Sequence, residues 1–277
     1  MRSDFETVAV ERRDNGILLV TLNRPDAANA LNTQMGRDLM ELFEGLSIDI
    51  EGLRVVILTG QGTKAFCAGG DLKQRNGMTD DAWQAQHLVF ERMQRAILAC
   101  PIPVIAAVNG AAYGGGCEIA AAADFVYAST NARFALTEVT LGIMPGAGGT
   151  QTLARAVGER RAKELILSGL PFSATDAEAW GLVNRVLPPE QLLEATFESP
   201  IGSPATGPFR CDRPSRRSNA ACKCRLRTAW PLRSKPIIAW CRRKTGAKAC
   251  APSTNGASRT SAAGDFYAAR RNQFRLC

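Results

Sequence analysis

Hydrophobic residues follow two kinds of spacing along the first two-thirds of the chain. Short runs rich in β-branched residues predict strands at 16–23 and 54–60. Apolar residues at helical spacing predict a helix after a cap at Asn32 and a longer helix over 80–99. Further apolar runs predict buried strands at 101–110, 124–129 and 181–188. Because strand and helix segments alternate, we predict an α/β fold.

Three glycine-rich segments interrupt this pattern: AFCAGGDLK (65–73), AYGGGCE (112–118) and GIMPGAGGTQ (142–151). Each lies between a strand-like and a helix-like segment. Backbone N–H groups at the start of a helix can face a bound ligand, and glycine lets the backbone approach that ligand closely. The three segments are therefore candidates for a binding site.

The composition is that of a globular protein with a sizeable core. The chain has 277 residues, of which 45% are hydrophobic, so it needs neither disulfides nor a metal for stability. Its opening, MRSDFETVAVERRDNG, contains acidic residues and no apolar stretch, and no later run approaches membrane-spanning length. We expect a cytoplasmic protein without a membrane partner.

Charge divides the chain near residue 198. Residues 1–198 contain 17 Lys and Arg against 24 Asp and Glu, whereas residues 199–277 contain 17 against 2. The overall charge of +8 therefore comes from the end of the chain and does not by itself predict a nucleic-acid partner. The cysteines after residue 198 match no zinc or redox spacing. We predict a core domain at 1–197 and an atypical basic segment at 198–277.

Two interpretations of residues 198–277 are open. Scattered Pro, Ser and Arg without periodicity are typical of a disordered basic tail. Alternatively, back-translation from Glu198 with permissive codons, re-read from the third base of each codon, gives a stretch with helical periodicity and balanced charge. This favours a frameshift near residues 198–205. Resequencing the coding DNA tests it, because a confirmed reading frame with the same tail in close relatives would contradict a frameshift.

The middle glycine segment combines consecutive glycines with a charge. Gly114, Gly115 and Gly116 can expose N–H groups at the start of a helix over 117–122, which suits a developing negative charge such as the enolate of an acyl thioester. A preorganised donor of this kind is typically worth about 10² to 10³ in rate. The alternative is close packing of helix on strand, with Glu118 pointing to solvent.

A second carboxylate favours chemistry over packing. Glu138 lies in an otherwise apolar segment, FALTEVTLGIMPGAGG, and a buried carboxylate is unfavourable unless it is paired or functional. Cys67 and Cys117 have no histidine placed to activate them, so we expect small buried packing residues. His87, the only histidine, is expected to be structural or at the surface, and Asp124 to end a helix or start a strand.

Four motifs in order resemble the enoyl-CoA hydratase (crotonase) family: KAFCAGGDLK, NGAAYGGGCEIAAAAD, FALTEVTLGIMPGAGGTQ and AKELILSGLPFSATDAEAWGLVNRVLP. The resemblance covers roughly residues 7–189. It implies a crotonase (ClpP-like) spiral of ββα units, assembled as a homotrimer or a dimer of trimers. The re-read tail also resembles the helical C-terminal region of that family.

The resemblance also implies roles for individual residues. The N–H groups of Gly70 and Gly115 would form an oxyanion hole. Glu118 and Glu138 would hold a water between them, with one carboxylate taking its proton and Glu138 protonating Cα. The residues expected along the bound coenzyme A are Ala28, Ala30, Ala68, Gly70, Asp71, Leu72, Lys73 and Gly115.

The implied reaction is reversible hydration of a 2-enoyl-CoA thioester to a 3-hydroxyacyl-CoA, as in fatty acid β-oxidation. It requires no metal and no cofactor, because coenzyme A is part of the substrate. A carnitinyl-CoA dehydratase, an enoyl-CoA isomerase or an inactive chain with a frameshifted end are the alternatives. A nucleic-acid-binding relative is a further one, tested by whether salt-dependent RNA binding persists in residues 1–197 alone.

Overall fold

The computed structural model of the chain describes residues 2–199. The predictions of a basic or frameshifted tail concern residues 198–277, of which 200–277 lie outside the described residues. Within residues 2–199, no helix is both long enough and apolar enough to cross a membrane.

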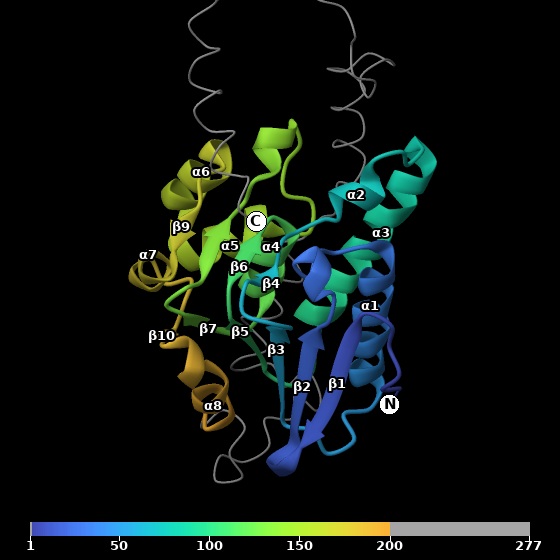
Figure 1. The fold of residues 1–277 in the computed structure, drawn as a ribbon, viewed down its shortest axis with the longest axis vertical. Coiled ribbons are helices and arrows are strands. Elements are labelled where there is room, and N and C mark those ends of the chain that lie inside the picture. Colours follow the sequence, from blue (N-terminus) through green and yellow to red (C-terminus); the bar gives the residue numbers. More distant parts are fainter. Residues whose placement is uncertain (1, 200–277) are drawn as a thin grey trace, which may run out of the picture. The chain divides into compact units, whose positions relative to one another are not determined.

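The larger sheet of the described residues has six strands, in the order β1-β2-β3-β5-β7-β10 (Figure 1). The first pair is antiparallel and every other neighbouring pair is parallel. The predicted strands at 16–23, 54–60, 101–110, 124–129 and 181–188 are confirmed as members of this sheet. Its strands are β1 (Val8–Arg13), β2 (Ile17–Leu22), β3 (Val55–Gly60), β5 (Val104–Val108), β7 (Phe125–Ser129) and β10 (Arg185–Leu187).

A smaller sheet of four short strands has the order β4-β6-β8-β9. The pairs β4–β6 and β6–β8 are parallel, whereas β8–β9 is antiparallel. None of these strands was predicted, because two or three residues are too few for an alternating pattern to stand out. They are β4 (Ala65–Cys67), β6 (Ala111–Tyr113), β8 (Arg133–Ala135) and β9 (Phe172–Ser173).

Helices surround the sheets, and the two longest pack against each other (Figure 1). The predicted cap at Asn32 is confirmed, since its side chain accepts a hydrogen bond from the N–H of Met35 at 2.8 Å. The helices are α1 (Thr33–Ile48), α2 (Leu72–Arg75), α3 (Asp80–Leu98), α4 (Gly115–Ala122), α5 (Gly149–Val157), α6 (Glu159–Ser168), α7 (Ala174–Ala179) and α8 (Leu192–Phe197). Short 3₁₀ helices include η2 (Pro25–Ala27) and η3 (Glu138–Leu141).

The two faces of the larger sheet carry separate apolar clusters, as the side-chain alternation of a strand requires. Along β2, Leu18 and Val20 belong to the main core with residues of α1 and α3. Ile17 and Leu19 belong to a second cluster, which Leu192 of α8 joins on the opposite face. Burial on both faces explains why β3 and β5 are apolar at nearly every position.

Candidate active site

The smaller sheet brings three loops to one edge. Since β4, β6 and β8 are parallel, their carboxyl ends lie at the same edge, where ligands commonly bind in open α/β sheets. The chain leaves β4 into residues 68–71, leaves β6 into α4, and leaves β8 towards Glu138. Two predicted glycine segments and the segment with the second carboxylate therefore meet here. The third glycine segment follows η3 rather than a strand, which corrects the prediction.

The backbones of the first two loops are in close contact. A Cβ atom added to Gly69 would lie 2.7 Å from the carbonyl oxygen of Tyr113, and one added to Gly114 would lie 3.3 Å from Oε1 of Glu138. Gly69 and Gly114 also have positive φ angles, of 92° and 49°. Glycine is thus required at both positions, and it lets the two loops and Glu138 approach one another.

Two backbone N–H groups in these loops have no acceptor among the described residues. The N–H of Leu31 donates to the carbonyl of Gly69 at 2.7 Å, and the carbonyl of Leu31 accepts from the N–H of Asp71 at 2.9 Å. Leu31 thus bonds to the residues on either side of Gly70 and leaves the N–H of Gly70 unbonded in the described part of the chain. Gly115 is the first residue of α4, two residues earlier than predicted, so its N–H has no intrahelical partner. Neither N–H donates to an acceptor within residues 2–199.

Glu118 is buried in α4, with 3% of its surface exposed. Its Oε1 accepts hydrogen bonds from the N–H of Ala147 at 2.9 Å and of Gly149 at 2.7 Å. Burial, and then the charge of Glu138, raise the pKa of Glu118 to about 8, although the two N–H donors favour ionisation. The alternative in which Glu118 points to solvent is therefore wrong.

Glu138 is the first residue of η3 and is also buried, with 9% exposed. Its Oε2 is inaccessible and accepts no hydrogen bond from any described residue. Burial raises the pKa of Glu138, while a hydrogen bond with its own backbone and, to a smaller extent, the guanidinium of Arg75 oppose that rise. Two carboxylates in one apolar site, each with a raised pKa, can move protons near neutral pH.

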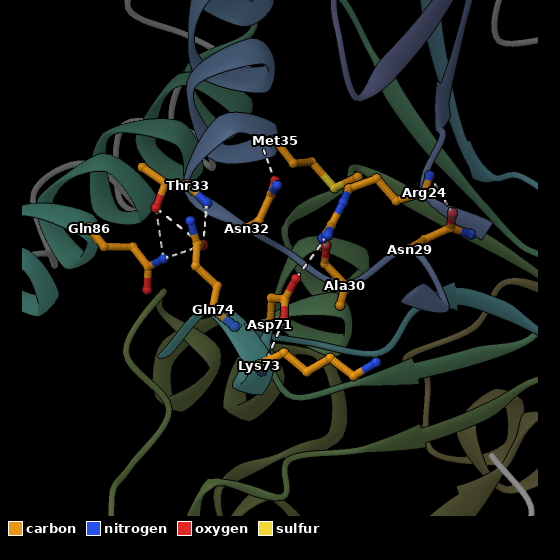
Figure 2. Close-up of polar contacts among 10 residues, drawn as sticks. All are labelled: Arg24, Asn29, Ala30, Asn32, Thr33, Met35, Asp71, Lys73, Gln74 and Gln86. Atoms are coloured by element: carbon orange, nitrogen blue, oxygen red, sulfur yellow. Dashed lines mark hydrogen bonds and ion pairs between the residues drawn. The ribbon is translucent and has the colours of Figure 1, made fainter. Parts of the chain in front are cut away.

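Figure 2 shows three of the residues predicted to lie along coenzyme A, namely Ala30, Asp71 and Lys73, near one another. Arg24 donates to Oδ2 of Asp71 at 2.9 Å and to the carbonyl of Ala30 at 2.6 Å. The N–H of Ala68 donates to the carbonyl of Ala28 at 3.1 Å. The segment before α1 is therefore joined to the loop that contains Gly70.

Asp71 stabilises the start of α2 by accepting from the N–H groups of Lys73 and Gln74 at 3.0 and 3.1 Å. Burial raises the pKa of Asp71, but the bonds from Gln74 and Arg24 outweigh burial, and its pKa lies below the usual value. Leu72 and Lys73 are exposed on the next turn. An exposed apolar and an exposed cationic side chain are thus adjacent on α2.

Other candidates have packing or structural roles. Cys67 and Cys117 are buried as predicted, and burial raises the pKa of both thiols, that of Cys67 to about 12. His87 stacks on Trp83 with ring centroids 5.7 Å apart, in keeping with a structural role. Asp124 lies between α4 and β7 and accepts from the N–H of Val104 at 2.9 Å.

Sequence reasoning missed the groups that hold these side chains. The N–H groups of Ala147 and Gly149 carry no side-chain signal, and only the glycine-rich composition of 142–151 pointed to them. Arg24 and Arg75 were overlooked because an isolated arginine looks like a surface residue until its surroundings are known.

The fold and site define a mixed α/β protein with paired N–H groups beside two buried carboxylates. A family model described as enoyl-CoA hydratase/isomerase matches residues 12–199. The chain belongs to the enoyl-CoA hydratase/isomerase family.

Individual relatives agree with this assignment. The chain is 42% identical over 197 residues to a putative enoyl-CoA hydratase/isomerase, YngF, of Bacillus subtilis, covering 71% of this chain and 75% of the relative. It is 42% identical over 188 residues to a 2,3-dehydroadipyl-CoA hydratase of Escherichia coli, covering 67% and 71%. The crystal structure of an enoyl-CoA hydratase from Bacillus anthracis matches with a TM-score of 0.68 at 41% identity, covering 70% and 74%. The predicted crotonase fold is thereby confirmed.

Proposed function

We propose that the chain is an enoyl-CoA hydratase that adds water reversibly to the double bond of a 2-enoyl-CoA thioester. The observation that carries this proposal is the pair of buried carboxylates, Glu118 and Glu138, beside two N–H groups that have no acceptor within residues 2–199. Relatives at about 40% identity are named hydratases of this kind.

The N–H groups of Gly70 and Gly115 would bind the thioester oxygen. Attack at Cβ moves the electrons of the double bond onto that oxygen, so the enolate gains negative charge that the substrate lacks. Fixed N–H donors stabilise the enolate more than the neutral thioester, which lowers the barrier. The two groups come from different loops, and the contact of Gly69 with Tyr113 holds those loops together.

The two glutamates would share one proton. Two ionised carboxylates in one buried site repel each other, so ionising the second is unfavourable. The two N–H donors on Glu118 favour its ionised form, whereas Oε2 of Glu138 accepts no hydrogen bond from a described residue. The raised pKa of Glu118 places the shared proton on Glu118 for much of the time in the free site. The form productive for hydration is the one with the proton on Glu138, to which we assign the role of acid. Glu118 takes a proton from water as the water oxygen bonds to Cβ, and Glu138 protonates Cα.

Coenzyme A would lie along the joined segments around Asp71. The carbonyls and small side chains of Ala28, Ala30 and Ala68 line one part of this path, and the exposed Leu72 and Lys73 line another. The ammonium group of Lys73 is suited to a phosphate of coenzyme A.

The proposed assembly is a homotrimer or a dimer of trimers. Exposed Leu141, Leu167 and Leu170 lie on η3 and around the end of α6, where a Cβ on Gly169 would lie 2.9 Å from Cγ1 of Val139. Such an apolar patch favours burial against another subunit. Light scattering on the full 277-residue chain tests this proposal, and a monomer would contradict it.

The hydration of crotonyl-CoA, followed by loss of absorbance of the conjugated double bond, tests the chemistry. Glu118→Gln and Glu138→Gln should each lower kcat by about 10² to 10⁴. The matched control is Glu164→Gln, which removes an exposed carboxylate paired with Arg161 and should leave turnover unchanged. Near-normal turnover in both active-site variants would refute the proposed roles.

A further inference from the structure

Arg75, the last residue of α2, places its guanidinium against Gly70. A Cβ atom added to Gly70 would lie 2.8 Å from Cζ of Arg75, and 3.0 and 3.1 Å from its two Nη atoms. The guanidinium thus occupies the space that any larger residue at position 70 would need. Because the N–H of Gly70 is the proposed binding site of the thioester oxygen, this cation lies at the reacting end of the substrate.

A neutral amide orients the Arg75 side chain. Its Nε–H donates to Oε1 of Gln86 at 3.2 Å, and Gln86 is 3% exposed. Nε2 of Gln86 donates to Oγ1 of Thr33 and to Oε1 of Gln74, each at 2.9 Å (Figure 2). This network fixes Arg75 through one nitrogen and supplies no carboxylate to pair with its charge.

The two Nη groups donate no hydrogen bond and form no ion pair with any residue in 2–199. Glu118 and Glu138 are near enough to favour the charged form of Arg75, yet neither makes a salt bridge with it. The side-chain atoms of the described residues that are both inaccessible and without a hydrogen bond do not include the two Nη atoms. The Nη atoms are therefore accessible. A half-buried guanidinium with two accessible nitrogens on one edge is suited to bidentate binding of a carboxylate.

Two other roles for Arg75 fit less well. A structural role would be met by a carboxylate partner, and none forms a salt bridge with Arg75 among the described residues; the contact of its Cζ with the Phe90 ring, 5.9 Å from the centroid, uses the face of the guanidinium and leaves its Nη edge free. If its purpose were to adjust the two glutamates, its influence should be large, but it is the smallest of the effects on the pKa of each. Binding of an anionic group of the substrate accounts for three features together. The Nη edge of Arg75 has no partner among the described residues, its Nε–H donates to the neutral Gln86, and the absence of a side chain at Gly70 gives the guanidinium room.

We propose that Arg75 makes the site select enoyl-CoA thioesters whose short acyl group carries a free carboxylate, which the two Nη groups bind. This inference rests on the proposed function, since it uses the thioester position at Gly70. Crotonyl-CoA, which has no such group, would be hydrated but bound less well. The reaction that supplies the substrate would then yield a dicarboxylic acyl-CoA.

Binding of unreactive saturated thioesters tests the inference apart from catalysis. Calorimetry on the full 277-residue chain would compare glutaryl-CoA, which has a terminal carboxylate, with butyryl-CoA, which has none. Glutaryl-CoA should bind about tenfold tighter or more, as expected for charge-assisted hydrogen bonds. Arg75→Met and Arg75→Gln should each abolish this preference while changing the affinity for butyryl-CoA little. The matched control is Arg37→Met, which removes an exposed arginine of α1 and should retain the preference.

The other outcomes would overturn the inference. Equal affinity of the unaltered chain for the two ligands would show that no acyl carboxylate is recognised. Equal weakening of both ligands in the Arg75 variants would assign Arg75 to a phosphate of coenzyme A instead. Crotonyl-CoA turnover in the same preparations separates the two proposals: a glutaryl-CoA preference without turnover would refute hydration only, and turnover without the preference would refute the role of Arg75 only.

Discussion

Replacing Glu118 with glutamine should stabilise the protein while removing its activity. Glutamine has nearly the same shape, and its Oε1 can still accept the hydrogen bonds from Ala147 and Gly149. It carries no charge, so the penalty for ionising a buried group beside Glu138 disappears. The same variant therefore separates the contribution of Glu118 to catalysis from its effect on stability.

The size of this effect follows from the pKa of Glu118. In the unfolded chain a glutamate has its ordinary pKa of 4.5, whereas in the folded protein burial and Glu138 raise it to about 8. Because the folded state holds the proton more tightly, the free energy of unfolding is greatest below the unfolded pKa and falls as the pH rises towards the folded one. The full difference corresponds to on the order of 5 kcal/mol.

Urea unfolding followed by tryptophan fluorescence, at intervals from about pH 5 to about pH 8, measures this dependence. The unaltered chain should lose stability across that range, and Glu118→Gln should lose less and be the more stable near pH 8. Glu164→Gln should behave like the unaltered chain, since its carboxylate is exposed. Parallel curves for all three proteins would show that the Glu118 carboxylate is not under strain, and the reasoning would be wrong.

Three further predictions concern the support of the site. Asp71→Ala removes the ion-pair partner of Arg24 and the cap of α2. The free energy of unfolding should therefore fall by about 1 to 2 kcal/mol, and the KM for crotonyl-CoA should rise. An unchanged KM would contradict this prediction. Gly116→Ala would overlap the carbonyl of Cys67 and should lower both melting temperature and turnover; a normal melting curve would contradict that packing. Cys67 and Cys117 should resist alkylation until urea unfolds the chain, as mass spectrometry would detect, and rapid labelling of the folded protein would contradict their burial.

The long strands and helices could be predicted because each is a periodic pattern that local physics alone produces. The apolar runs that became β3 and β5 needed only their β-branched residues and their ends to be recognised. The strands β4, β6 and β8 have three residues each and owe their conformation to pairing with one another across long stretches of chain. Nothing within three residues specifies a partner that distant.

The residues of the site with a proposed role in the reaction could be predicted only where the sequence itself marks them. Glu118 and Glu138 were found because a carboxylate in an apolar segment is unusual, and Gly70 and Gly115 because the glycine motifs resemble a known family. The N–H groups of Ala147 and Gly149 belong to the backbone, which every residue shares. Their role depends on where these N–H groups point, and only the folded chain fixes their orientation towards Glu118.

The stretch from Glu138 to Gly149 carries one glutamate and supplies the two N–H donors that fix the other. The relative position of the proposed acid and base is therefore controlled by a single continuous piece of backbone. An insertion or deletion between these residues would alter both carboxylates at once, whereas a change of an exposed side chain such as Met144 would leave the donors in place. Variation in this stretch should accordingly be tolerated at its exposed side chains but neither in its length nor at its glycines, because Gly142 has a positive φ and Gly146 lies against His87.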